Sequence, residues 1–225
     1  MTDSLRVMIE RGRKKPVAVA VAFDWPGWER PGKSEEDALR VLGTYRPRYA
    51  RVAELAGLAD EFRDIGEPYV VERIEGIGMT DFYGLSMRPA GPEQEQVSEA
   101  ACDRKIALLR ASWTYFDEVA SRVSAELRKG PRGGGRDRDR IVEHVNNVEI
   151  SDFSRKVGLD APIEAQQDPE ALRAYRDAFC AAIREANGRG SAARNWTVQF
   201  VIRHAAYHVL DHTWEMEDRD LAGDS

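Results

Sequence analysis

A regular repeat of apolar residues between positions 102 and 127 constrains the fold of this chain more than any other feature. The apolar positions advance by alternating steps of four and three residues: Cys102, Ile106, Leu109, Trp113, Phe116, Ala120, Val123 and Leu127. That spacing places all of them on one face of an α-helix, as in the seam of a helix bundle. The sequence therefore predicts a long amphipathic helix that buries this face against other helices.

Three further helices are predicted downstream of this seam. The second is expected from about Asp137 to Val157, with Gly158 as its C-terminal cap. Asp168-Pro169 is typical of a helix start, because aspartate accepts hydrogen bonds as an N-cap and proline suits the first helical position. The fourth helix occupies about Asn195 to Glu217. Four such helices joined by short loops indicate a four-helix bundle.

The first third of the chain has a different pattern. Short runs rich in β-branched residues occur at 5–9, 16–23 and 69–74, and the first two are separated by a segment suited to a hairpin loop. Between the second and third runs, Ser34 followed by Asp37 approximates a capping box at the start of a helix. We therefore expect a small β-β-α-β unit.

Residues 91–97 join these two patterns, at the end of a stretch (88–97) with two prolines, a glycine and polar residues but no periodicity. The expected fold class is α+β. Residues 1–90 are expected to form the small β-β-α-β domain, with 91–97 as a linker, 98–220 as the four-helix bundle and 221–225 as a tail.

Composition narrows the function classes. The formal net charge of −6 argues against nonspecific nucleic-acid binding, which needs a dominant basic surface. No apolar run is long enough to span a bilayer, so no membrane association is expected, and the N-terminus lacks the layout of a signal peptide. We expect a cytoplasmic protein in which Cys102 and Cys180, two isolated thiols, are free and buried.

Three of the four histidines fall in one predicted helix, at four-residue spacing: His204, His208 and His212. Residues four apart lie on the same helical face, so His208 and His212 can share a divalent metal, whereas His204 and His212 are eight residues apart and too distant. His144, on the second predicted helix, can supply a third ligand if the two helices pack together. The alternative is that these histidines are structural, because HxxxH alone is a weak signal and HExxH is absent.

Three imidazoles leave room for water on a zinc, nickel or iron ion. Glu215 lies nearest the proposed ligands in a helical projection, so Glu215 and Tyr207 are the candidates for proton transfer. Asp211 and Glu149 are further acidic residues that could orient ligands or move protons, with Glu149 the weaker candidate.

Residues 206–219, preceded by the helix containing residues 140–145, resemble the DinB/YfiT-like superfamily of metalloenzymes, over about residues 98–220. In that superfamily a four-helix bundle holds a divalent metal through one histidine of the second helix and an HxxxH pair of the last, which assigns His144, His208 and His212. Members include thiol-dependent S-transferases and isomerases. The resemblance implies a small-molecule substrate and a low-molecular-weight thiol as cofactor, and we include a homodimer among the expected oligomeric states.

Residues 24–39 are similar to the turn and helix start of HicB-like antitoxin domains, which mostly bind a partner protein. The same turn has a structural explanation, since Pro26-Gly27 reverses the chain and Ser34 caps the helix. The alternative function is therefore a noncatalytic protein-binding module with a HicB-like recognition domain and structural histidines.

Overall fold

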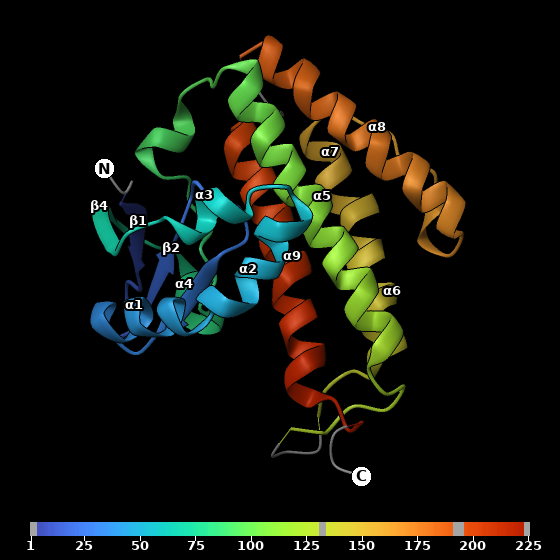
Figure 1. Ribbon diagram of the computed structural model, residues 1–225, viewed down its shortest axis with the longest axis horizontal. Helices are drawn as coiled ribbons and strands as arrows, with labels where there is room; N and C mark the ends of the chain where they lie inside the picture. Colours follow the sequence, from blue (N-terminus) through green and yellow to red (C-terminus); the bar gives the residue numbers. More distant parts are fainter. Residues whose placement is uncertain (1–3, 131–133, 191–195, 223–225) are drawn as a thin grey trace.

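The computed structural model describes residues 4–130, 134–190 and 196–222. The fold is α+β, with a small four-stranded sheet in the N-terminal part and a mostly helical C-terminal part (Figure 1). The first three residues of the chain, Asn195 at the expected start of the last helix and the last three residues of the expected tail lie outside the described residues. Within the described ranges, no helix combines the length and apolar character needed to cross a membrane.

The described residues of the N-terminal part, from position 4 onward, form four strands and four short helices. These are β1 (Leu5–Arg11), β2 (Ala18–Val21), β3 (Glu29–Gly32), α1 (Glu35–Thr44), α2 (Arg46–Leu55), α3 (Ala59–Arg63), β4 (Pro68–Glu75) and α4 (Gly78–Tyr83). The sheet order is β3-β2-β1-β4, with β4 parallel to β1 and the other pairs antiparallel. The predicted β1–β2 hairpin is confirmed. The predicted β-β-α-β order was incomplete, because it lacked β3 and the helices after α1.

The missing strand β3 has the sequence Glu-Arg-Pro-Gly, which has no apolar alternation. Proline is tolerated because β3 is an edge strand. The central strands were recognisable because apolar side chains cover both faces of the sheet, with Val7 and Ile9 in one core cluster and Met8 in another. The expected cap is also present, since Ser34 Oγ accepts a hydrogen bond from the Asp37 N–H.

In the C-terminal part, the residues that the structure describes form four long helices and shorter helical turns. These are a 3-10 turn (Gly91–Gln94), α5 (Glu99–Arg122), α6 (Arg138–Val148), a π-helical turn (Glu149–Phe153), α7 (Ser154–Lys156), a 3-10 turn (Ile163–Gln166), α8 (Pro169–Gly188) and α9 (Val198–Arg219). The helix predicted from the apolar repeat at 102–127 is α5, which ends earlier than expected, at Arg122. The last two residues of the repeat, Val123 and Leu127, are nevertheless buried. The free, buried state of both cysteines is confirmed.

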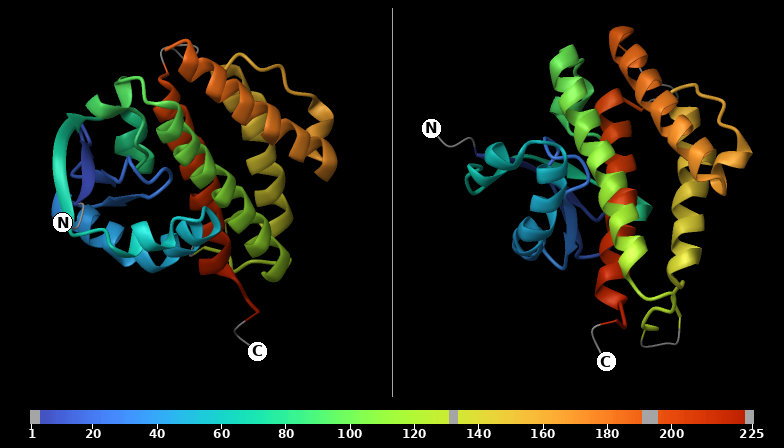
Figure 2. Two further views of the ribbon diagram at one scale, coloured as in Figure 1. Left: turned by 45° about the horizontal axis from the view of Figure 1, so that its top comes forward. Right: turned by 45° about the vertical axis from the view of Figure 1, so that its right-hand side comes forward.

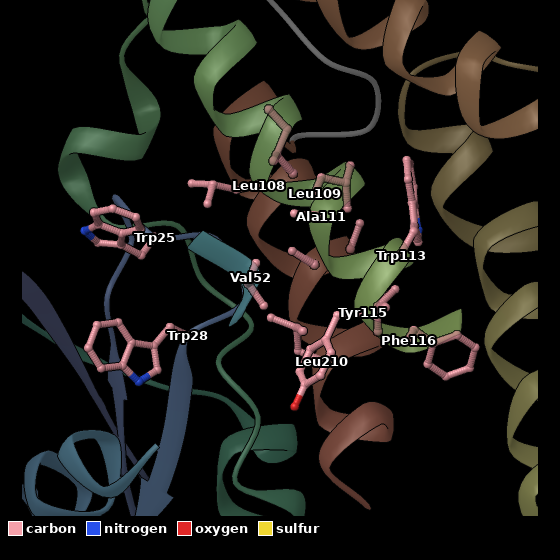
Figure 3. Packing of buried hydrophobic residues seen from close by; sticks show 14 of the residues in the cluster. Trp25, Trp28, Val52, Leu108, Leu109, Ala111, Trp113, Tyr115, Phe116 and Leu210 are labelled. Atoms are coloured by element: carbon pink, nitrogen blue, oxygen red, sulfur yellow. The ribbon is translucent and has the colours of Figure 1, made fainter. Parts of the chain in front are cut away.

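Helix α9 lies between the N-terminal sheet and the other long helices, alongside α5 (Figures 1 and 2). One cluster of buried apolar residues continues from Trp25 and Trp28 through Val52 to Leu210 and Phe116 (Figure 3). The segment expected as a linker is part of this packing, because Glu93 in its 3-10 turn is fully buried. The sheet, the turn and the long helices therefore hold α9 from several sides.

Candidate metal centre

Helices α6 and α9 bring three of the four histidines together. His208 Nε2 lies 3.4 Å from His144 Nε2. One ring nitrogen from each of His144, His208 and His212 lies within 4.8 Å of the others. The arrangement follows from local structure, since His208 and His212 are one helical turn apart on α9 and His144 faces them from α6.

The spacing of these nitrogens fits a metal ion. Two nitrogen ligands of a tetrahedral zinc ion, each about 2.0–2.1 Å from the metal, lie about 3.3–3.4 Å apart. The separation between His144 and His208 matches this value, although an N–H···N hydrogen bond has a similar length. His208 Nδ1 is buried and has no hydrogen-bond partner among the described residues, so the outer nitrogen of this ring lacks the support that metal-bound histidines usually have.

Electrostatics favour the neutral form of His144 and His208, which is the form that binds a metal. Burial, with the neighbouring His212 and His144, lowers the pKa of His208 to about 2. Burial and the nearby His212 also lower the pKa of His144. A nitrogen lone pair on each of these two rings is therefore available at neutral pH.

Glu215 holds the third histidine. His212 Nδ1 lies 2.8 Å from Glu215 Oε2, and Arg219 Nη1 donates to Glu215 Oε1 at 2.5 Å. The hydrogen bond with His212 and the one from Arg219 lower the pKa of Glu215 against the opposing effect of burial, so this carboxylate is ionised at neutral pH. A carboxylate at Nδ1 selects the tautomer in which Nε2 is unprotonated and faces the other two rings. Glu215 is thus placed to orient a ligand; its role in proton transfer stays a prediction.

The other predicted polar residues lie elsewhere. Tyr207 is buried on the side of α9 that faces the sheet, where Asp211 and Glu29 raise its pKa further above the level set by burial. Asp211 accepts a hydrogen bond from Arg30 Nη1 at 2.9 Å. Glu149 is not beside the histidines but accepts from Trp113 Nε1 at 2.5 Å, within a buried group on α5 and α8.

His204 is outside the cluster, as its spacing predicted. Its ring lies against Trp196, Phe200 and Phe153, with centroid separations of 5.3, 5.5 and 5.9 Å. Burial lowers its pKa to about 3, and its Nδ1 has no hydrogen-bond partner within the part of the chain that the structure describes. It acts as a neutral aromatic residue in the wall beside His208.

One buried group of charged residues was not predicted from the sequence. Arg203 Nε donates to Glu93 Oε1 at 2.7 Å, and Arg203 Nη1 donates to Glu29 Oε2 at 3.0 Å. All three residues are at most 1% exposed. The sequence feature that could have indicated it is the position of Arg203 on the apolar face of the last helix, three residues from Phe200 and seven from Leu210.

Comparisons of this chain with models of protein families, with curated proteins and with solved structures found no match. The geometry of the three histidines is therefore the main basis for a functional proposal.

Proposed function

We propose that α5, α6, α8 and α9 form a DinB-like four-helix bundle that binds a divalent metal through His144, His208 and His212. The observation that carries this proposal is the convergence of three imidazole nitrogens within 4.8 Å, on two different helices. Bundle proteins commonly build metal sites in this way, from side chains on facing helices. Zinc, nickel and iron all accept imidazole ligands.

The surrounding residues support this assignment. Glu215 fixes the tautomer and orientation of His212, and the low pKa of His208 and His144 keeps protons from competing for the ligand nitrogens. Phe153 lies 5.9 Å from the ring of His208 and provides an apolar wall that limits access of water. These are properties of a site that binds a divalent metal at neutral pH.

When bound, such a metal would acidify a coordinated water or hold a thiol sulfur as thiolate at neutral pH. On the DinB resemblance, we propose a metal-dependent transferase or isomerase that acts on a small molecule with a low-molecular-weight thiol as cofactor. Glu215 is the group proposed for proton transfer, because it contacts His212 directly. Tyr207, the other residue predicted for this role, lies on the side of α9 that faces the sheet and is not part of the proposed site.

Elemental analysis of protein purified without an affinity tag tests the metal site. We expect near-stoichiometric metal in the wild type, loss of metal in His208→Ala and His144→Ala, and retention in His204→Ala as the matched control. Metal-free wild type that cannot be reconstituted with zinc, nickel or iron would reject the site. If metal is bound, incubation with glutathione, mycothiol or bacillithiol and an electrophile tests the reaction, and turnover without dependence on the thiol would reject the transferase.

The second candidate is a noncatalytic protein-binding module. It is favoured by exposed aromatic side chains on β4 and α4, where Tyr69, Phe82 and Tyr83 are 63%, 71% and 70% exposed. Exposed aromatic residues of this kind are typical of partner surfaces. Protein that binds no metal and keeps the same stability in His144→Ala would favour this function over the first.

A further inference from the structure

A cleft separate from the histidines lies between the N-terminal sheet and α5. Its volume is about 1050 Å³, and none of His144, His208 and His212 lines it. Its walls come from the loop after β2, from β4, from the segment before α5 and from α5 itself. The apolar part of this lining includes Phe23, Trp25, Ile65, Tyr69, Val71 and Val97.

Lys105 of α5 also lines this cleft, although it is only 5% exposed. Its Nζ donates one hydrogen bond, of 2.7 Å, to the carbonyl oxygen of Phe23. An ammonium group has three N–H donors, so two remain without an acceptor among the described residues. A buried charge is costly unless it is paired, and this one is only partly satisfied.

The carboxylates near Lys105 are already engaged. Asp24 accepts two hydrogen bonds from Arg6, each 2.7 Å long. Glu93 accepts from Arg203 and from the Ala90 N–H. Asp24 and Glu93 favour the charged form of Lys105, but among the described residues neither carboxylate accepts a hydrogen bond from its Nζ.

The other charged residues that line the cleft limit the charge that a ligand can carry. Arg104 donates to Glu61 at 2.5 Å, so this cation is paired at the rim. The other lining acids are Asp64, which pairs with Arg63, and the exposed Glu95. These acids repel a ligand that carries several negative charges, such as a phosphate ester. They leave Lys105 as the lining cation without a carboxylate partner among the described residues.

We propose that this cleft binds a small monocarboxylate with an apolar body, whose carboxylate accepts hydrogen bonds from Lys105. The apolar body contacts Phe23, Trp25 and Val71, which line the cleft. One carboxylate supplies two acceptor oxygens, which matches the two unused donors of the ammonium group. This site does not depend on the metal centre.

Isothermal titration calorimetry tests the proposal with benzoate, phenylacetate and hexanoate, each compared with its primary amide. The titrations use His208→Ala protein, so that a carboxylate bound to metal cannot contribute. At least one acid should bind roughly tenfold or more tightly than its amide, because a hydrogen bond to a charged group is lost in the amide. Equal behaviour of all three acids and their amides, including no binding of either, would overturn the proposal.

Variants locate the site. Lys105→Met should reduce the affinity for the carboxylate roughly tenfold or more, whereas Lys105→Arg, which keeps the charge, should retain binding. Lys14→Met, a change at an exposed lysine of the β1–β2 hairpin, is the control and should have no effect. Unchanged binding in folded Lys105→Met would place the carboxylate elsewhere and reject the assignment.

A pH series keeps the assignment testable if Lys105→Met does not fold. Burial lowers the pKa of Lys105 to about 8, with Asp24 and Glu93 opposing this effect and Arg104 and Arg203 adding to it. Affinity for the carboxylate should therefore fall between pH 7 and pH 9.5 in protein with Lys105, as the ammonium loses its proton. It should stay constant in Lys105→Arg, and an equal fall in both proteins would contradict the role of Lys105.

Discussion

His144 Nε2 on α6 and His208 Nε2 on α9 lie 3.4 Å apart, although 64 residues separate them in the sequence. Their separation matches that of two ligands on one tetrahedral metal ion. His212 completes the cluster from the next turn of α9, and Glu215 holds its outer nitrogen. The following predictions test this relationship and the packing that produces it.

Glu215→Gln should weaken metal binding by about 10- to 100-fold, because His212 loses the carboxylate that orients its ring and raises its basicity. Competition with a chromophoric chelator measures this change. Glu143→Gln is the matched control, since Glu143 precedes His144 but is exposed and pairs with Arg140. Equal affinities in wild type and Glu215→Gln would contradict the orienting role of Glu215.

His204→Phe should retain the full metal content, because His204 lies outside the cluster and packs as an aromatic ring against Trp196 and Phe200. Its effect on the free energy of unfolding should be within about 1 kcal/mol, the scale of one hydrogen bond. His208→Phe, an identical change one turn later, should abolish metal binding. Elemental analysis and urea unfolding measure both variants, and loss of metal from His204→Phe would show that the ligand set is wrong.

Gly27→Ala should destabilise the protein by about 2–4 kcal/mol, by adding steric overlap to an unfavourable backbone conformation. Gly27 has a φ of 89°, and a Cβ there would lie 2.7 Å from Leu210 Cδ1 and 2.9 Å from the Ala206 carbonyl carbon of α9. Gly57→Ala is the control, because φ is 73° but nothing lies within 4 Å of the added Cβ. It should cost only about 1–2 kcal/mol. Equal losses in urea unfolding would show that the loop does not press against α9.

Glu29→Gln should change how stability depends on pH. Burial, opposed by Arg203, raises the pKa of Glu29 from 4.5 to about 7. The folded protein therefore holds a proton that the unfolded chain releases between these values. The stability that this group contributes is fully present below pH 4.5 and is lost as pH rises through 7.

Glutamine cannot titrate, so wild type should lose stability relative to Glu29→Gln between pH 5 and pH 8. Urea unfolding at several pH values measures the difference, with Glu36→Gln on the exposed face of α1 as the control. Parallel stability curves for wild type and Glu29→Gln would show that Glu29 has an ordinary pKa in the folded protein.

The parts of this fold that depend on residues close together in the sequence were predictable. Ser34 and Asp168 cap α1 and α8 as expected, because a cap is a hydrogen bond made within one helical turn. The same reasoning placed His208 and His212 on one face of a helix. Strand β3 was not predictable, since its buried Glu29 and Arg30 pair with Arg203 and Asp211 of α9, more than 170 residues away.

By itself, the sequence determined α1 and the long helices α5, α6, α8 and α9, where most of these five begin, and which face of the last helix carries the histidines. Only the tertiary structure decided which buried charges are paired, that Glu149 contacts Trp113 and Arg176, and that Lys105 lines a cleft. The physical reason is the distance along the sequence over which each interaction acts. Helical periodicity and capping act over a few residues, whereas the free energy of burying a charge depends on partners that only the packing of distant segments supplies.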